Sequence, residues 1–74
     1  MALVKVHADM DGTVFELPRA PGDALVEGDA IVILESMKME VVAGAPCGGR
    51  LERMLVAVGD TVTQGAVLAV IETA

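Results

Sequence analysis

Short runs of alternating apolar and polar residues, separated every few positions by glycine or proline, follow one another along this chain of 74 residues. A period of two and an enrichment in Val, Ile and Leu are strand signals. The pattern predicts strands at 3–7, 13–17, 25–26, 31–35, 40–43, 50–56, 61–63 and 67–72, with turns at 9–12, 22–23 and 27–29. We therefore expect an all-β protein.

Apolar residues also recur at helical spacing in two stretches, 30–37 and 51–58. The first is apolar at every position from 30 to 34, so its spacing carries little weight. The second aligns, in the repeat described next, with residues 18–21, where two prolines would stop a helix. A helical turn within 51–58 remains a minor alternative.

The two halves of the chain align without a gap at a shift of 37 positions. Identical pairs are Val4 and Val41, Ala8 and Ala45, Gly12 and Gly49, Ala20 and Ala57, Gly22-Asp23 and Gly59-Asp60, Gly28 and Gly65, and Glu35 and Glu72. Other pairs, such as Phe15 with Glu52, do not match. We predict one domain, 1–74, built from repeats 1–37 and 38–74 as two half-sheets related by a pseudo-twofold axis.

The repeat also predicts where special backbone conformations and the chain ends lie. The glycines at 22, 28, 59 and 65 are expected at tight turns that need positive φ, which glycine adopts at least cost. Met37 aligns with Ala74, and the chain ends where the image of Lys38 would fall. The two termini should therefore lie close together, at the end remote from Lys38.

Composition sets the character of the core and the size of the stability margin. Hydrophobic residues make up 54% of the chain, but Phe15 is its one aromatic residue, so the core must be aliphatic. A chain this short buries only about 60% of the surface that its unfolded form exposes. Neither half should be stable alone.

Charge and hydropathy exclude several functional classes. The net charge of -6 argues against nucleic-acid binding, because phosphates attract clustered Lys and Arg. The longest apolar run, 66–71, is far shorter than the roughly 20 residues that span a bilayer. Charged residues interrupt any secretory signal near the amino terminus. We expect a cytoplasmic protein that binds neither nucleic acid nor membrane.

Catalytic and metal-binding residues are not evident. Cys47 and His7 are the only residues of their types, too few for a disulfide or a structural zinc site. Cys47 is expected in a turn, and a lone His7 is more typical of an exposed strand residue than of a general base. No nucleophile, base and orienting group can be combined. The sequence predicts no catalytic residue and no metal.

The centre of the chain breaks a local rule. If 31–36 and 39–43 pair as a hairpin, Met37 and Lys38 occupy the two central turn positions, where Asn-Gly or Asp-Gly is usual. Violated local preferences tend to mark functional sites. Lys38 would project its amine into solvent from a rigid turn. The plain alternative is an exposed lysine flanked by two methionines, Met37 and Met39, that pack against the sheet.

Ser36-Met37-Lys38-Met39, in this setting of strands and repeat, resembles the Ala/Ser-Met-Lys-Met motif of the biotin carboxyl carrier (biotinyl domain) family. The resemblance covers the whole chain and implies a flattened β-barrel of two four-stranded sheets, with covalent biotin on Lys38. Glu35 matches the acidic position associated with ligase recognition. Serine in place of the commoner alanine at position 36 is a mild departure.

The resemblance also implies a role and partners. A biotin protein ligase would modify Lys38, and the attached biotin would carry a carboxyl group from a biotin carboxylase to a carboxyltransferase. The chain itself would not be an enzyme. The segment 17–28 lacks the inserted thumb of many bacterial acetyl-CoA carboxylase carriers, so the chain is more similar to thumbless domains or to free-standing biotin/lipoyl attachment proteins. Met1 and the end at Ala74 fit the free-standing form, and an excised domain would look the same.

Two rival interpretations remain. A lipoyl domain shares the fold and the hairpin lysine, but it typically has aspartate before the lysine and a small residue after it, so Met37 and Met39 disfavour it. An unmodified interaction module, such as the hairpin domain of an efflux adaptor, predicts that no ligase modifies Lys38. The missing export signal counts against that module.

Overall fold

The computed structural model describes residues 1–73, and it contains eight strands. They are β1 (Leu3–His7), β2 (Gly12–Glu16), β3 (Ala24–Leu25), β4 (Ala30–Ser36), β5 (Met39–Gly44), β6 (Gly49–Met54), β7 (Thr61–Val62) and β8 (Val67–Glu72). The all-β prediction is confirmed. Within residues 1–73 no helix is long and apolar enough to cross a membrane.

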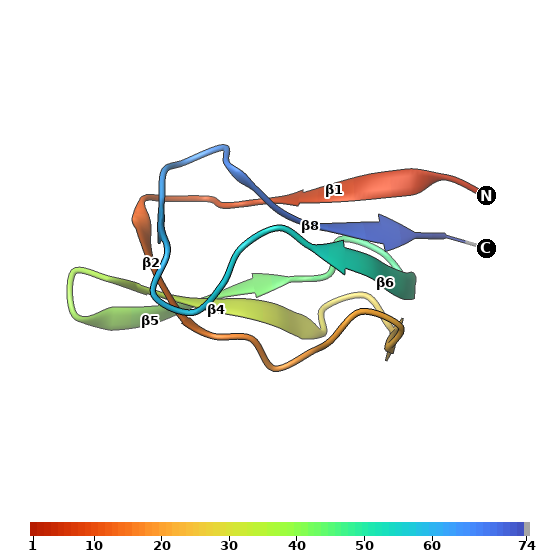
Figure 1. Cartoon of the computed structure of the whole chain (residues 1–74), viewed down its shortest axis with the longest axis horizontal. Helices are drawn as coiled ribbons and strands as arrows, with labels where there is room; N and C mark the ends of the chain where they lie inside the picture. The colour runs from red at the N-terminus through yellow and green to blue at the C-terminus, as the bar shows by residue number, and fades with distance from the viewer. Residues whose placement is uncertain (74) are drawn as a thin grey trace.

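The strands form two four-stranded antiparallel sheets, in the orders β1-β8-β6-β3 and β5-β4-β2-β7 (Figure 1). Exchanging β1 with β5, β2 with β6, β3 with β7 and β4 with β8 turns the first order into the second. The repeat in the sequence is therefore a structural repeat, and the predicted pseudo-twofold relation of the two sheets is confirmed. Each half of the chain contributes strands to both sheets.

Equivalent hydrogen bonds hold equivalent turns. Asp23 Oδ2 accepts a bond from the Ala20 amide at 2.9 Å, and Asp60 Oδ2 accepts one from the Ala57 amide at the same distance. The glycines predicted at positive φ adopt it, with φ of 98° at Gly22 and 97° at Gly59. The turn at 20–23 joins β2 to β3, and the matching turn at 57–60 joins β6 to β7.

The core lies between the two sheets and is aliphatic, as predicted. Its fully buried side chains come from β2, β4, β6 and β8; the largest are Ile31, Leu34, Leu51, Leu68, Ile71, Val14 and Val32. Alternate side chains of a strand point to opposite faces, so the inner faces of these four strands supply the largest buried side chains. Phe15 is not part of this core: its side chain is 49% exposed.

Strand bounds differ from the predicted ones mainly beside turns. Val26 was expected in a strand, but its amide donates to Asp29 Oδ2 at 2.9 Å and not to a neighbouring strand. β6 ends at Met54 and not at 56, since Met54 and Ala69 are its last register pair with β8; one further hydrogen bond joins the Leu55 amide to the Leu68 carbonyl. The helical alternative for 51–58 is wrong, since residues 51–54 belong to β6.

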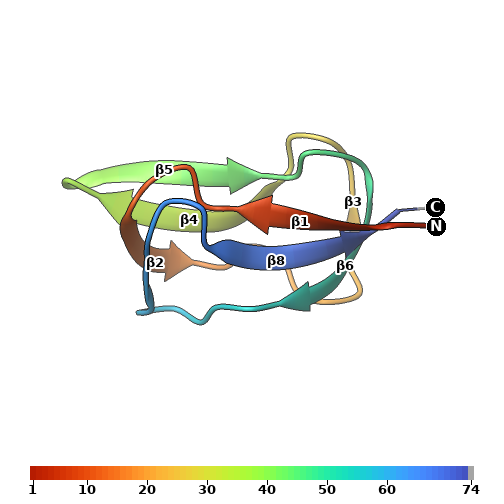
Figure 2. The same cartoon turned by 90° about the horizontal axis from the view of Figure 1, so that it is seen from above.

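The described termini lie side by side at one end of the molecule, and the β4–β5 turn lies at the other end (Figures 1 and 2). The Thr73 amide donates to the Ala2 carbonyl at 2.9 Å, and the Ala2 amide donates to Thr73 Oγ1 at 3.1 Å. The molecule measures 36 × 19 × 18 Å, so its long axis separates the two ends. The predicted placement holds as far as Thr73; Ala74 lies outside the described residues.

Candidate functional site: the lysine hairpin

The β4–β5 hairpin turns through Met37 and Lys38, as predicted. Their φ angles are 51° and 65°, the only positive values at non-glycine residues within 1–73. Ser36 and Met39 are the first register pair below the turn. Positive φ at both central residues of a two-residue loop is the type I′ geometry, which matches the twist of the flanking strands. The turn keeps this geometry without the Asn or Gly that usually supplies it.

Strand pairing and core packing fix the base of the hairpin. β4 pairs with β5 on one side and with β2 on the other, and it is the longest strand of the fold. Its inward side chains, Ile31, Val32 and Leu34, are almost completely buried. Because the paired strands and the core fix its base, the turn can hold a backbone conformation that costs of order 1 to 3 kcal/mol per residue.

The side chains at the turn project into solvent. Met37 is 93% exposed and Met39 is 64% exposed, so the alternative in which both methionines pack against the sheet is wrong. Lys38 is exposed as well. The ion pairs within residues 1–73 join Arg19 to Asp29 and Arg53 to Glu52, and neither includes Lys38. The turn therefore presents an accessible primary amine between two thioethers.

Glu35, the acidic residue predicted to assist recognition, lies next to the turn. It is exposed on β4, between Glu40 of β5 and Thr13 of β2 in the register. β2 approaches closely here: a Cβ on Gly12 would lie 2.9 Å from the Glu35 carbonyl oxygen. Sequence reasoning did not identify Gly12 as the residue that permits this approach. Its match with Gly49, beside Glu72 in the other half, was the available signal.

The other candidates for chemistry have structural surroundings. His7 Nδ1 donates to the Gly65 carbonyl at 2.9 Å, which ties β1 to the turn before β8. Asp11 Oδ1 accepts a hydrogen bond from the backbone amide of Gln64 at 2.8 Å. Cys47 is half-buried and packs against the core. None of these residues is brought together with Lys38 in a set that could perform acid–base or nucleophilic chemistry.

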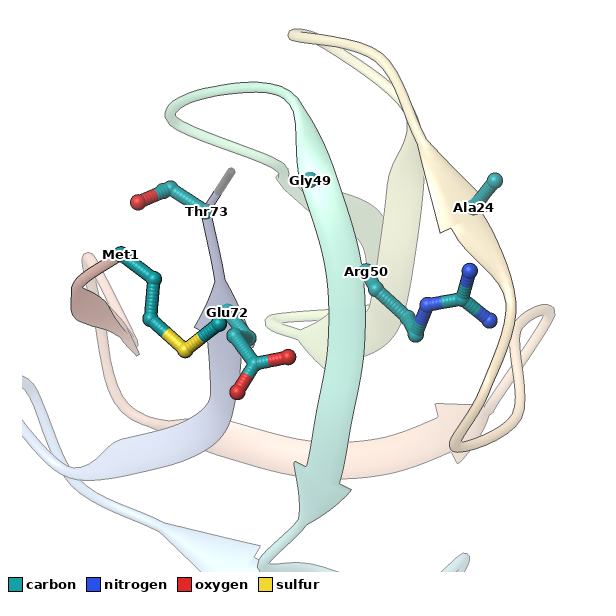
Figure 3. A pocket seen from close by; sticks show the side chains of 6 residues that line it. All are labelled: Met1, Ala24, Gly49, Arg50, Glu72 and Thr73. Carbon is teal, nitrogen blue, oxygen red and sulfur yellow. The ribbon is translucent and has the colours of Figure 1, made fainter.

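A pocket of about 290 Å³ lies at the opposite end, beside Met1 and Thr73 (Figure 3). Its lining residues are Met1, Ala24, Gly49, Arg50, Glu72 and Thr73. The shift of 37 positions maps these onto Lys38, Thr61, Gly12, Thr13, Glu35 and Ser36. The pocket is thus the pseudo-twofold image of the lysine site, with Met1 in the place of Lys38. In Figure 3 the side chains of Arg50 and Glu72 lie on either side of the β6 ribbon.

Comparison with known proteins identifies the family of the chain. The family model described as "Biotin-requiring enzyme" matches residues 6–71. The chain belongs to this biotin/lipoyl family. Its members include biotin carrier domains, and covalent biotin is the cofactor that the matches support.

Two curated relatives come from Mycobacterium leprae. The "Biotinylated protein TB7.3 homolog" is 39% identical over 66 residues, which are 89% of this chain and 93% of the relative. The "Biotin-dependent acyl-coenzyme A carboxylase alpha3 subunit" is 42% identical over 67 residues, 90% of this chain but only 11% of the subunit. The chain therefore spans nearly all of a small biotinylated protein and a small part of a carboxylase subunit.

Solved structures agree on the fold. The urea carboxylase of Kluyveromyces lactis matches with a TM-score of 0.92 and 32% identity, covering 97% of this chain and 6% of that one. A single-chain, multi-domain long-chain acyl-CoA carboxylase matches with a TM-score of 0.90 and 35% identity, covering 97% of this chain and 7% of that one. This is a biotin carrier domain of the kind found in biotin-dependent carboxylases. The implied group fits the site, because biotin is attached through an amide and Lys38 offers an exposed primary amine.

Proposed function

We propose that Lys38 is the residue that carries biotin, and that the chain acts as a carboxyl carrier without catalysing a reaction itself. The observation that carries the proposal is the type I′ turn, which holds Lys38 at the tip of a paired hairpin, anchored in the core by β4, in spite of unfavourable backbone angles. Attached biotin supplies a ring nitrogen that can accept and release a carboxyl group. The chain supplies a rigid hairpin, and the Lys38 side chain with its attached biotin forms the flexible arm that reaches a partner's active site.

The first partner in this proposal is a biotin protein ligase. The neutral Nζ of Lys38 attacks the carboxyl carbon of biotin, which the ligase has joined to AMP as a mixed anhydride with release of pyrophosphate from ATP. An amide C–N bond forms, AMP leaves, and the amine proton passes to solvent. Met37 and Met39 can assist because their exposed, flexible thioethers adapt to the surface of a partner. Glu35 adds a negative charge close to the tip.

The further partners are a biotin carboxylase site, where the arm is loaded, and a carboxyltransferase site, where it is unloaded. The names of the two carboxylases whose structures share this fold support this pairing. The position of the hairpin, at the end of the long axis remote from Met1 and Thr73, suits a tip that enters one active site and then another. A cytoplasmic location belongs to the same proposal and can be tested by cell fractionation.

Carboxyl transfer to the arm provides the test. The biotinylated chain is incubated with a biotin carboxylase, ATP and ¹⁴C-bicarbonate, then separated from small molecules in the cold at alkaline pH. The proposal predicts label on the wild-type chain and none on Lys38→Arg. A biotinylated chain that never acquires label with several carboxylases would contradict the carrier role.

A further inference from the structure

The outer faces of the two sheets can be compared residue by residue, because the repeat relates them. In the sheet β1-β8-β6-β3, Val70 of β8 lies in register between Lys5 of β1 and Arg53 of β6. Val70 is only 7% exposed although it lies on the outer face. Long basic side chains cover apolar surface with their aliphatic stems. In this row of three register partners, the stems of Lys5 and Arg53 therefore cover Val70, and a basic residue stands at each end.

The equivalent row in the hairpin sheet has the opposite character. Ile33 of β4 takes the place of Val70 and lies between Val42 of β5 and a bulge in β2, where Glu16 is its register partner. Val42 replaces Lys5, Glu16 replaces Arg53, and Phe15 replaces Glu52. None of the register partners in this row is Lys or Arg: Val42 is 54% exposed and Phe15 is 49% exposed, and Ile33 between them is half-buried.

Charge also distinguishes the two faces. Acidic residues surround the exposed row of the hairpin sheet, with Glu16 beside it and Glu35 and Glu40 paired between it and the turn. None of the residues paired with β4 in either register is Lys or Arg. The other sheet carries Lys5, Arg50 and Arg53 at its paired positions, together with Glu72, which faces Arg50, and Glu52, which forms an ion pair with Arg53, so its charges are mixed. The hairpin sheet thus presents an apolar centre with an acidic surround.

The exposed row lies within reach of a protein that acts on the tip. Val42 is four residues from Lys38, about 13 Å along an extended strand. One partner of a standard interface contributes about 800 Å², an area roughly 30 Å across. A protein whose active site encloses Lys38 would therefore cover Val42, Ile33 and Phe15 if it approached from this side.

We propose that the outer face of the sheet β5-β4-β2-β7, centred on Val42, Ile33 and Phe15, is the docking surface for the biotin protein ligase. The ligase surface that fits it is apolar at its centre and carries Lys and Arg at its edge, to complement Glu16, Glu35 and Glu40. This inference rests on the proposed function. The ligase is the expected occupant because it acts on Lys38 before biotin is attached. At that stage the side chain is shorter than the biotinylated lysine. The ligase has to approach the hairpin more closely than the later partners do.

A second copy of the chain is a less suitable occupant. Two such faces would bring six glutamates together, and each chain carries a net charge of -6. Like charges across an interface oppose association. Docking of this face on the mixed-charge face of another copy would place it against Val70, which is only 7% exposed and offers little apolar surface.

The test uses substitutions that the repeat itself provides. Val42→Lys installs the residue found at the equivalent position of the other sheet, and Lys5→Val makes the reciprocal change on the opposite face. Val42→Thr removes apolar character while keeping the shape and adding no charge. Each folded variant is incubated with ligase, biotin and ATP, and the biotin-sized mass gain is followed over time at several carrier concentrations.

The proposal predicts that Val42→Lys lowers kcat/KM for biotinylation at least tenfold, through KM, and that Val42→Thr lowers it about threefold. Lys5→Val should stay within twofold of the wild type, and all variants should reach the same final mass gain at long times. Circular dichroism confirms folding, and Val42→Thr carries the test if Val42→Lys does not fold.

Rates within twofold of the wild type for both Val42 variants would overturn the docking surface. So would unchanged ligase rates combined with slower loading by the carboxylase, since the face would then belong to that partner. A mass by sedimentation that rises with concentration for the wild type but not for Val42→Lys would assign the face to a second copy. A wild-type chain that gains no mass would instead refute the proposed function.

Discussion

Glu35 and Glu40 lie directly opposite each other across β4 and β5, two register pairs below the turn that carries Lys38. Both are exposed. Cross-strand partners have Cβ atoms only about 4.5–5.5 Å apart, and like charges in that arrangement are destabilising. In the other half of the repeat, Glu72 faces Leu3 and Arg50. The lysine hairpin therefore has a pair of facing glutamates, and the equivalent place in the other half does not.

Removing one of these charges should stabilise the fold. Glu40→Gln is expected to raise the free energy of unfolding by roughly 0.2–0.5 kcal/mol at low salt, because it relieves the repulsion from Glu35. Added salt should shrink the gain, since it screens exposed charges. Urea unfolding at two ionic strengths measures both effects. Glu72→Gln, which removes a charge that faces Arg50, should give no gain; a gain of the same size there would show that net charge, and not the pair, is responsible.

Glu35 should contribute to recognition by the ligase, whereas Glu72, its equivalent in the repeat, should not. Glu35→Lys is expected to lower kcat/KM for biotinylation about tenfold, a change of about 1.4 kcal/mol in the transition state. Glu72→Lys makes the same substitution at the far end of the molecule. Time courses of the mass gain compare the two. Equal losses in both variants would mean that overall charge controls recognition.

The turn should be more stable with a residue that tolerates positive φ. Met37→Asn is expected to raise the free energy of unfolding by about 0.5 kcal/mol, because asparagine accepts the left-handed conformation more readily than methionine. Thermal unfolding measures the change. Met39→Asn is the matched control, since Met39 lies in β5 and asparagine is unfavourable in strands. If Met37→Asn also destabilised the chain, the turn would not be under strain.

The two aspartates that close equivalent turns should contribute equally. Asp23→Ala and Asp60→Ala each remove the acceptor for one amide, at 2.9 Å in both cases, and each should cost about 1 kcal/mol. The corresponding Asn variants keep an acceptor and should cost less. Chemical denaturation measures all four. Strongly unequal losses would show that the repeat does not extend to the energetics of the turns.

Much of the fold follows from the sequence, for physical reasons that the structure makes plain. Alternation and glycine punctuation predicted every strand, and β1 and β8 have the predicted bounds because they carry uninterrupted strand patterns. The repeat predicted the matching sheets. It also predicted the single lysine tip, since Met37 and Lys38 break the usual turn preference where the second half has no counterpart.

What the sequence could not supply depends on contacts between distant segments. The end of β3 is set by the Asp29 carboxylate, which takes the Val26 amide from the sheet. The pairing of Glu35 with Glu40 depends on register, and the exposure of Val42 depends on what lies on neighbouring strands. The mismatch of Phe15 with Glu52 was visible in the repeat, but its meaning required knowing which faces the two residues occupy.

Attachment of biotin to Lys38 can be measured by intact mass after incubation with a biotin protein ligase, biotin and ATP, followed by fragmentation to locate the modified residue. The chain has two lysines, Lys5 and Lys38, so Lys5→Arg and Lys38→Arg form a matched pair of equal charge. We predict a single biotin-sized gain on Lys38 in the wild type and in Lys5→Arg, and no gain in Lys38→Arg. A gain that persists in Lys38→Arg, or a wild type that gains no biotin-sized mass, would contradict the assignment of Lys38 as the biotinylated residue.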